Sequence, residues 1–380
     1  MPNDRNVGIN KSIIVCVIMD KKTSDPRKQV MLNWLSNDIK LDIEKCEPAS
    51  EDASFRRYFR VTLRNPPRGS LIPKALSPKS QGASHVEQTP DSLIVMDAPP
   101  EKEPLDTFLK TTRLLRTHNI NAPHIYAKNI AQGFLLLEDF GSVNYVDKLH
   151  CNATELYPLA IDTIVLLQLA CFKTPQSELP TYSAQKLDDE MQLFEDWYLS
   201  VHLKHKMTAT QLKAWAELRA HLVRQCVQQP QVWVHRDYHS RNLMVLDKNS
   251  PGVIDYQDMV IGPLTYDLAS IFKDCYIEWP RTQQLEWLQN YQQKLRHAAG
   301  EIEQATELSN IDFDQLVKWY DMTALQRHIK VLGIFCRLNY RDNKPNYIND
   351  LPMVKRYVLE VLPRYPQLRT FLNEFSSLLN

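Results

Sequence analysis

The sequence predicts an α+β protein of two lobes, in which a small antiparallel sheet precedes a large, mainly helical region. Two observations carry this prediction. Short apolar or alternating runs separated by turns fill the chain up to about residue 140. From residue 152 onward, apolar residues instead recur at helical spacing, as in Leu156, Leu159, Leu166 and Ala170. The predicted parts are an N-terminal extension (1–30), a sheet lobe (31–141) and a helical lobe (142–380).

The N-terminal extension contains one apolar run, residues 13–19. The run is too short to cross a bilayer, and charged residues follow it directly. We therefore expect no membrane span here. A short strand and a poorly ordered extension both remain open.

The sheet lobe is predicted to contain five short strands and one helix. Residues 44–63 form two strands around the polar turn 49–54, and the second strand alternates apolar and basic side chains as a half-exposed strand does. Residues 65–90 are rich in Pro, Ser, Lys and Gly, which predicts a flexible insertion in a surface loop. The remaining elements are strand 92–97, helix 105–117, and strands 124–129 and 134–137.

The helical lobe is predicted from helical periodicity and start signals. Thr208 is the expected N-cap of a helix that runs to about Gln228. Further helices are predicted near residues 268–278, 282–299, 312–341, 353–362 and 368–378. No internal repeat is visible.

The most informative segment is residues 235–242, HRDYHSRN, which matches the kinase catalytic-loop pattern H-R-D-x-x-x-x-N. In that pattern the Asp orients or accepts the proton of the attacking hydroxyl, and the Asn holds a metal ion. Asp237 and Asn242 occupy these two positions. Phosphoryl transfer depends on an in-line hydroxyl, a nearby carboxylate and divalent metal more than on covalent help. The segment therefore predicts phosphoryl transfer from ATP.

Asp255 is the predicted second metal ligand. Residues 243–246 and 253–254 are strand-like and flank a turn, so they predict a hairpin that returns Asp255 to Asn242. Mg²⁺ takes hard oxygen ligands and usually only one or two protein carboxylates, which this pair satisfies. The alternative, that Asp237 and Asp255 only cap turn amides, fits the eight-residue match less well. His235 is expected to be a buried residue that shapes the loop, and His239 to pack within it.

Six further blocks accompany this loop: ASFRRYFR at 53–60, LIVMDAPP at 93–100, LLLEDFG at 135–141, GVIDYQD at 252–258, GPLTYDLAS at 262–270 and DCY at 274–276. With them, the chain resembles the aminoglycoside phosphotransferase superfamily, small-molecule kinases with a protein-kinase-like fold. Within that superfamily it is most similar to the bacterial N-acetylmuramate/N-acetylglucosamine anomeric kinases, which act in cell-wall sugar recycling. The likeness spans roughly residues 30–375 outside the insertion.

The resemblance implies roles at matching positions. Asp237 would be the catalytic carboxylate, and Asn242 and Asp255 would bind Mg²⁺. Asp267 would support the catalytic loop together with His235. The ATP contacts would come from the phosphate-covering turn and the hinge, and their residues would be Ser54, Arg57, Glu138, Asp139 and Phe140.

The sequence departs from the kinase pattern in its phosphate contacts. It has no glycine-rich phosphate loop. Strand 93–97 lacks the lysine that usually pairs with phosphate, and Arg56, Arg57 or Lys102 are candidates to replace it. Glu101 and Glu103 are candidates for the acidic partner of that cation.

A small acceptor is predicted because only twelve positions separate Asp255 from Asp267, which leaves no room for a long activation segment. By resemblance the acceptor is a hexosamine phosphorylated on its anomeric hydroxyl. Arg241, Asp274 and Tyr276 are the predicted sugar contacts. An arginine that pairs with a lactyl carboxylate would distinguish muramate from glucosamine, and Arg337 and Arg341 are candidates for that role.

Two alternative functions remain open at this point. An aminoglycoside or choline-like amino-alcohol kinase would need a strongly acidic pocket, whereas the helical lobe mixes both signs of charge, with Lys and Arg around residues 327–344. A nucleotide-binding pseudokinase or regulatory module is favoured by the missing strand lysine. It is disfavoured by the intact Asp237, Asn242 and Asp255.

The composition excludes several other classes. Lys and Arg number 45, as do Asp and Glu, so no nucleic-acid or anionic-membrane partner is expected. The seven cysteines are scattered without a C-x-x-C pair, which argues against a zinc site or disulfide framework and fits a reducing cytoplasm. The expected partners are the sugar and ATP, and the expected state is a cytoplasmic monomer.

Overall fold

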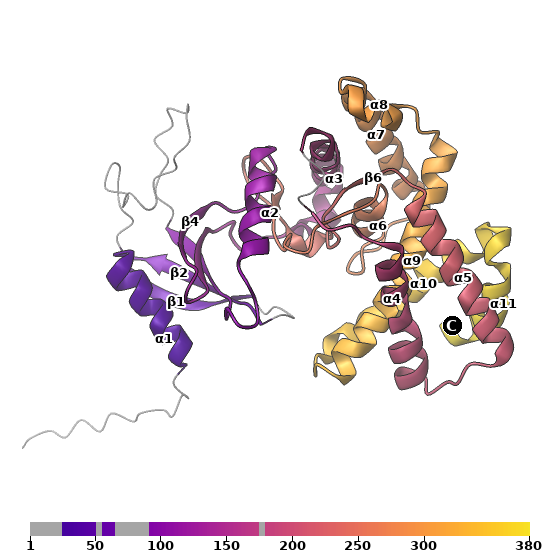
Figure 1. The fold of residues 1–380 in the computed structure, drawn as a ribbon, viewed down its shortest axis with the longest axis horizontal. Coiled ribbons are helices and arrows are strands. Elements are labelled where there is room, and N and C mark those ends of the chain that lie inside the picture. The colour runs from indigo at the N-terminus through magenta and orange to yellow at the C-terminus, as the bar shows by residue number, and fades with distance from the viewer. Residues whose placement is uncertain (1–24, 51–54, 65–90, 175–178) are drawn as a thin grey trace, which may run out of the picture.

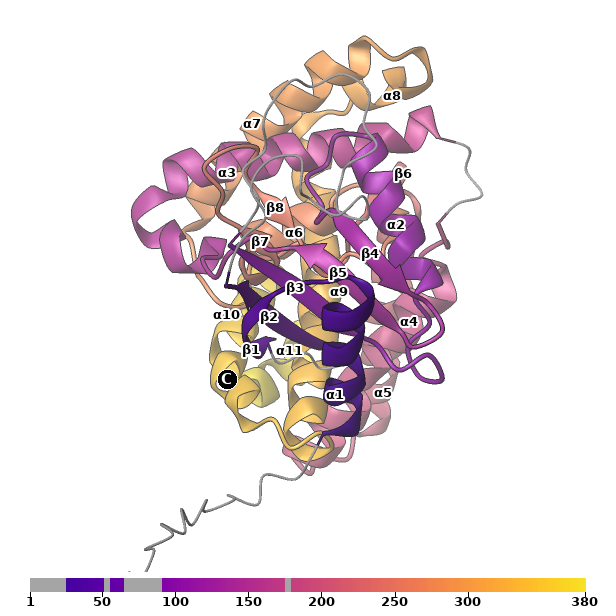
Figure 2. The ribbon, with the colours of Figure 1, turned by 90° about the vertical axis from the view of Figure 1, so that its left-hand side faces the viewer.

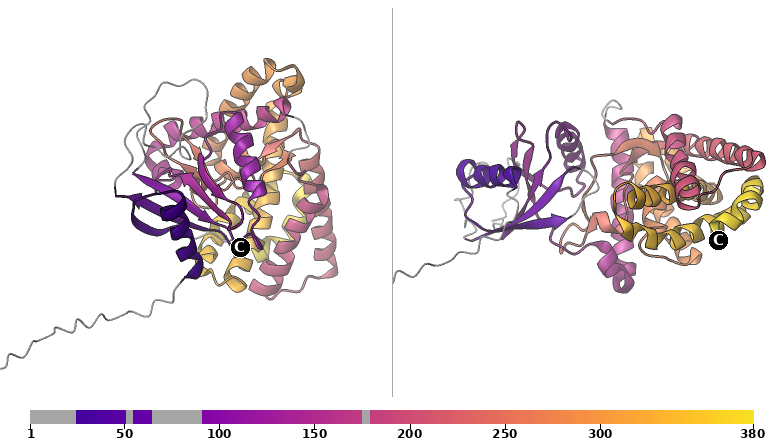
Figure 3. Two further views of the ribbon diagram at one scale, coloured as in Figure 1. Left: turned by 60° about the vertical axis from the view of Figure 1, so that its left-hand side comes forward. Right: turned by 90° about the horizontal axis from the view of Figure 1, so that it is seen from below.

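The computed structural model describes residues 25–50, 55–64, 91–174 and 179–380, and it has the predicted two-lobe α+β architecture (Figure 1). A sheet lobe lies at one end of the molecule and a larger helical lobe at the other, as the view from below also shows (Figure 3). The predictions for residues 1–24, Ser54 and the insertion 65–90 lie outside the described residues.

The sheet lobe is built on five antiparallel strands in the order β1-β2-β3-β5-β4. Each predicted strand is present, with ends within a few residues of those expected. The observed bounds are β1 Ile43–Ser50, β2 Arg57–Leu63, β3 Ser92–Asp97, β4 Ile125–Asn129 and β5 Phe134–Glu138.

A helix that the sequence analysis missed covers one face of this sheet. Helix α1 (Pro26–Asn33) begins after Asp25, whose carboxylate accepts a hydrogen bond from the Lys28 backbone N–H at 3.0 Å. It lies across the front of the strands (Figure 2). Its buried residue Met31 and the following Trp34 pack with strand residues such as Val95. The first helix thus starts inside the segment expected to be an extension.

The other face of the sheet shares its core with the helical lobe. Helix α2 (Asp106–Thr117) contributes Phe108 and Leu115, which are buried in one cluster with Leu137 of β5. The same cluster continues into the helical lobe through Tyr145 and Tyr256. The two lobes are therefore joined by continuous apolar packing as well as by the chain.

The helical lobe is organised around α9 (Phe313–Tyr340), which is buried along most of its length and contacts α4, α5, α6 and α10. Thr208 is the N-cap of α5 and forms a capping box with Gln211, as predicted for that residue. The other helices are α3 Tyr145–Ala170, α4 Ala184–Leu193, α5 Ala209–Val227, α6 Tyr266–Phe272, α7 Arg281–Gly300, α8 Thr306–Ser309, α10 Leu351–Val361 and α11 Arg369–Leu379.

Helix α6 is shorter than predicted, because it ends at Phe272 and not near residue 278. Lys273, which follows it, is fully buried, and the Asp274 carboxylate accepts a backbone hydrogen bond from Tyr276 at 3.1 Å. This local side-chain bond replaces the helical pattern. A π-helical turn, Phe194–His202, that extends α4 was also not predicted.

Two short strand pairs flank the predicted catalytic loop, residues 235–242. Strand β6 (Gln231–Val234) pairs with β9 (Val260–Pro263), and β7 (Leu243–Met244) pairs with β8 (Gly252–Val253). The predicted hairpin between residues 243 and 254 is therefore present.

Within the part of the chain that is described, one helical segment, Tyr145–Lys173, is long and apolar enough to cross a membrane. Its most apolar window is 61% buried inside the fold. That burial is typical of a core helix.

Candidate active site

A cleft of about 500 Å³ lies between the lobes. The sheet lobe contributes Tyr58 and Arg60, and the segment that joins the lobes contributes Glu138–Gly141. The helical lobe contributes Asn242 and Asp255 from the predicted catalytic loop and hairpin, together with Arg241, Tyr276 and Tyr347. The cleft thus gathers residues from distant parts of the chain.

The catalytic loop leaves β6 in an unusual backbone conformation. Arg236 has φ 75°, a value that costs a non-glycine residue about 1–3 kcal/mol. Asp267, in the first turn of α6 and 1% exposed, accepts hydrogen bonds from the backbone N–H groups of His235 at 2.7 Å and Arg236 at 3.1 Å. These bonds offset the strain. Burial raises the pKa of Asp267 to about 7. Asp267 is therefore placed as predicted for a loop support.

His235 is buried and holds the loop against the hairpin. Its Nε2 lies 3.0 Å from the carbonyl oxygen of Ile254, so this nitrogen carries the proton and donates. Burial lowers the pKa of His235 to about 4, which keeps the ring neutral. The ring therefore links the loop to the residue that precedes Asp255.

Asp237 lies at the turn of this loop. Burial alone would raise the pKa of its carboxyl, but nearby charge, above all that of Lys330, holds the pKa below its usual value. Arg236 and Arg327 act in the same direction. The side chain is therefore an ionised carboxylate, able to accept a hydrogen bond from a substrate hydroxyl.

Asn242 and Asp255 meet as the hairpin prediction requires. Asn242 Nδ2 is 3.3 Å from Asp255 Oδ2 and donates to the backbone oxygen of Asp237 at 3.0 Å. Asp255 adopts φ 61°, and its other carboxylate oxygen accepts from Gln257 Nε2 at 2.7 Å. Two oxygen-bearing side chains are thus held together beside Asp237.

A charge network beneath the loop was missed by sequence reasoning. Glu190 of α4 lies 2.6 Å from Arg236 Nη2 and 2.9 Å from Lys330 Nζ of α9, and it also accepts a hydrogen bond from the hydroxyl of Tyr182. The three charged side chains are at most 14% exposed. The arginine of the loop motif was the only signal, because its partners come from two helices remote in sequence.

The segment that joins the lobes uses its acidic side chains structurally. The Asp139 carboxylate accepts from Arg60 Nε at 2.6 Å, Ser92 Oγ at 2.7 Å and the Gly141 backbone N–H at 2.8 Å. The Glu138 carboxylate accepts from the His124 backbone N–H at 3.0 Å. A ligand here would meet the backbone and the buried ring of Phe140.

The predicted phosphate cations are engaged elsewhere in the sheet lobe. Arg57 forms ion pairs with Asp25 and Asp97 and does not line the cleft. Arg56 pairs with Glu103 at 2.8 Å, and both side chains are largely buried, at 13% and 15% exposed. The structure therefore pairs one candidate cation, Arg56, with one candidate acidic partner, Glu103.

On the helical side of the cleft, Asp274 organises two segments. Its carboxylate is fully buried and accepts from the backbone N–H groups of Ser240 at 2.8 Å and Tyr276 at 3.1 Å. The guanidinium of Arg241 lies 3.5 Å from the centre of the Tyr276 ring. Arg241, Asp274 and Tyr276 therefore form one unit, whereas Arg337 and Arg341 do not line the cleft.

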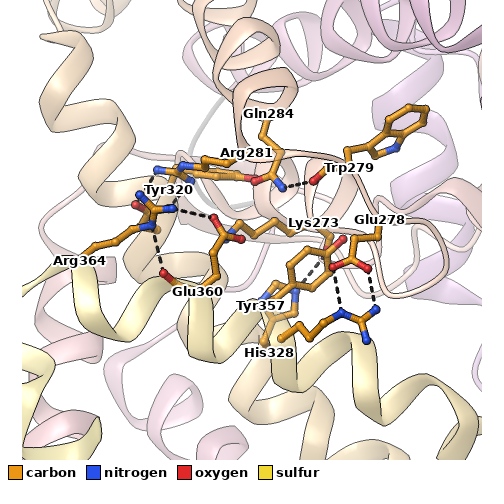
Figure 4. Close-up of polar contacts among 12 residues, drawn as sticks. Lys273, Glu278, Trp279, Arg281, Gln284, Tyr320, His328, Tyr357, Glu360 and Arg364 are labelled. Carbon is orange, nitrogen blue, oxygen red and sulfur yellow. Dashed lines mark hydrogen bonds and ion pairs between the residues drawn. The ribbon is translucent and has the colours of Figure 1, made fainter.

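This unit is anchored from behind by a buried polar network, drawn in Figure 4. Lys273 points toward Glu360, with Nζ to carboxylate oxygen at 3.3 Å, and its ammonium lies 5.5 Å from the centre of the Tyr357 ring. The backbone oxygen of Lys273 is 2.9 Å from His328 Nε2. Residues 273 and 274 are thus fixed to α9, α10 and the catalytic loop.

The fold and the cleft define a class of enzyme, and residues 45–305 match the phosphotransferase enzyme family, to which the chain belongs. It is 38% identical over 322 residues to an N-acetylmuramate/N-acetylglucosamine kinase of Pseudomonas aeruginosa, covering 84% of this chain and 85% of that protein. A protein of the same name from Neisseria meningitidis serogroup B is 33% identical, with 84% and 86% covered. The resemblance inferred from the sequence is confirmed.

Solved structures of low sequence identity share the fold. Choline kinase LicA from Streptococcus pneumoniae matches with a TM-score of 0.56 at 11% identity, covering 89% of this chain and 99% of that one. ADP-bound aminoglycoside phosphotransferase APH(2'')-Ib matches with a TM-score of 0.52 at 13% identity, covering 88% and 97%. The protein-kinase-like fold predicted from the sequence is therefore confirmed.

Proposed function

We propose that this protein transfers the γ-phosphoryl group of ATP to the anomeric hydroxyl of an amino sugar, N-acetylmuramate, N-acetylglucosamine or both. The observation that carries this proposal is that Asn242 and Asp255 meet in the cleft wall, while the Asn242 side chain also donates to the backbone oxygen of Asp237. The names of the relatives at 33–38% identity support the acceptor class.

The residues present fit magnesium. Within the described residues, no three His, Cys, Asp or Glu side chains are grouped to form an all-protein metal cage. Mg²⁺ in kinases does not need one, because one or two protein oxygens and the phosphates suffice. Asn242 and Asp255 would hold the ion, and bound magnesium would neutralise charge on the phosphate oxygens.

In the proposed reaction Asp237 accepts a hydrogen bond from the acceptor hydroxyl and takes its proton as the hydroxyl oxygen bonds to the γ-phosphorus. The bond from that phosphorus to the β,γ-bridging oxygen breaks, and ADP leaves. The low pKa of Asp237 makes it a weak base. An anomeric hydroxyl is more acidic than other sugar hydroxyls, so a weak base is sufficient. The strained loop held by Asp267 and His235 fixes the direction of that carboxylate.

The nucleotide is proposed to bind where the joining segment meets the sheet. Glu138 and Asp139 hold the segment in place with their side chains, which leaves backbone groups near Phe140 for the adenine. Arg60, which lines the cleft and pairs with Asp139, is a better-placed cation than Arg57.

The test is ATP consumption with a panel of amino sugars, aminoglycosides and choline, with the position of the product phosphate determined by phosphorus NMR. We expect turnover with an N-acetylated hexosamine and an anomeric phosphate. Asp237→Asn should abolish turnover while nucleotide still binds. Turnover only with a cationic acceptor would assign the chain to the aminoglycoside or choline-like kinases. Nucleotide binding without any turnover would assign it to the pseudokinase class.

A further inference from the structure

Arg241 is a charged residue of the cleft for which the described residues show no countercharge in contact. Arg60 pairs with Asp139, and Asp255 is held by Gln257 and Asn242. For Arg241, no ion pair within 4 Å is found among the described residues, and the side chain is exposed to the cleft. Asp350 is near enough to influence it electrostatically but does not contact it. An exposed guanidinium in a cleft is a candidate anion contact.

The guanidinium is also fixed in orientation. Its Cζ lies 3.5 Å from the centre of the Tyr276 ring, a close cation–π contact. The ring therefore limits the motion of the guanidinium, while the side chain remains exposed to the cleft. That arrangement matches a planar carboxylate, which can accept two parallel hydrogen bonds.

The support beneath this stack is rigid. The Asp274 carboxylate holds the backbone N–H of Ser240, next to Arg241, and the backbone N–H of Tyr276. The ring of His239 meets that of Tyr276 edge to face, with 5.3 Å between ring centres. Lys273 and its contacts to Glu360 and His328 secure the same segment from behind (Figure 4). Little side-chain freedom is lost when an anion binds to such a platform.

We propose that Arg241, stacked on Tyr276, is a carboxylate subsite for the acceptor, so that the enzyme discriminates a carboxylate-bearing amino sugar from a neutral one. This proposal rests on the proposed function. Arg241 comes from the helical lobe, lines the cleft together with Asn242 and Tyr347, and belongs to the same loop as Asp237, the residue proposed to meet the acceptor hydroxyl. Among N-acetylated hexosamines, N-acetylmuramate carries a lactyl carboxylate and N-acetylglucosamine does not.

The test compares KM for the two sugars in the parent protein and in Arg241→Gln. A lost charge-assisted bidentate contact should raise KM for N-acetylmuramate about tenfold to a hundredfold. KM for N-acetylglucosamine and for ATP should change less than about threefold. Arg341→Gln is the matched control, because Arg341 pairs with Asp342 and does not line the cleft. Arg241→Lys should restore only part of the discrimination, since it keeps the charge and loses the fork.

The stacking element is tested separately. Tyr276→Phe keeps the ring and should keep the preference for the acidic sugar, whereas Tyr276→Leu should lose it. Equal increases in KM for both sugars would overturn the carboxylate subsite, as would an increase confined to ATP, which would mean a phosphate contact. An unchanged KM for N-acetylmuramate in Arg241→Gln would also overturn it.

Failure of the proposed function is distinguishable from failure of this subsite. If the parent protein phosphorylates neither sugar, calorimetric titration with each sugar tests the subsite without turnover. Binding of N-acetylmuramate that weakens about tenfold or more in Arg241→Gln would support the subsite even then. Equal binding of both sugars to both proteins would refute it.

Discussion

Acidification should destabilise this protein through His235 in a way that one substitution can isolate. His235 is 1% exposed, and its Nε2 donates to the carbonyl of Ile254 at 3.0 Å. Its Nδ1 is buried, with no hydrogen-bond partner among the described residues. A second proton would go on Nδ1, where nothing described accepts it. Burial accordingly lowers the pKa of His235 from 6.5 to about 4.

The sign and size of this pH effect on the unfolding free energy follow from the linkage between proton binding and folding. Because the unfolded chain binds the proton more readily than the folded one, the contribution of His235 is complete above pH 6.5. It is lost as the pH falls toward 4. Each pH unit across that window is worth about 1.4 kcal/mol. Between pH 7 and about pH 4.5, His235 should therefore remove roughly 2 kcal/mol of unfolding free energy.

The assay is urea unfolding at several pH values for the parent and for His235→Gln. A glutamine amide nitrogen reaches the place of Nε2 and can donate to Ile254, but it does not titrate. Burial also depresses the pKa values of His239 and His328, so the parent curve alone mixes several groups. The difference in unfolding free energy between the parent and His235→Gln isolates the contribution of His235. This difference should shrink by about 2 kcal/mol on acidification. Parallel curves for the two proteins would refute the reasoning.

Five other substitutions test three features of the structure. Glu190→Gln removes the countercharge of two buried cations beneath the catalytic loop, Arg236 and Lys330. In steady-state kinetics kcat should therefore fall about tenfold while KM values stay nearly constant. Glu190→Asp keeps the charge and should recover part of the lost kcat. In Gly252→Ala the new methyl group would lie 2.6 Å from a ring carbon of Phe140 and would displace that ring. In kinetics with each substrate varied in turn, KM for ATP should rise and KM for the sugar should not. Lys273→Met should change the unfolding free energy by less than about 1 kcal/mol in urea unfolding. Glu360→Ala should lower it by about 2 kcal/mol, because this substitution leaves the buried ammonium of Lys273 without its partner.

The geometry of the loop at residues 235–242 and of the hairpin after it could be predicted from sequence because the information is local. The spacing of Asp237 and Asn242 lies within one loop, and the hairpin that returns Asp255 needs only two strands and a turn. The alternation of residues 55–61 likewise predicted a strand here, observed as β2 at Arg57–Leu63, since such a pattern is a property of one strand. Asp267 was placed from the family resemblance, and its two backbone hydrogen bonds agree with that placement.

Pairings between distant elements were beyond the sequence patterns. Arg57 was considered a phosphate contact, but it stands directly opposite Asp97 in the β2–β3 ladder, and only the strand register reveals that partner. Glu190 and Lys330 come from separate helices that meet under the loop. Helix α1 was missed because its short apolar stripe becomes meaningful only once the sheet face it covers is known.

The apolar cluster that runs from β5 through α2 into the helical lobe has a thermodynamic consequence. Separating the lobes would expose to water apolar side chains such as Phe108 and Tyr256, whose ring centres are 5.2 Å apart. That exposure is unfavourable in free energy. The protein should therefore unfold in one calorimetric transition. A fragment that ends near residue 141 should be unstable, because one apolar face of its sheet lobe would be exposed to water. We therefore expect the two lobes, although distinct in shape, to unfold as one cooperative unit.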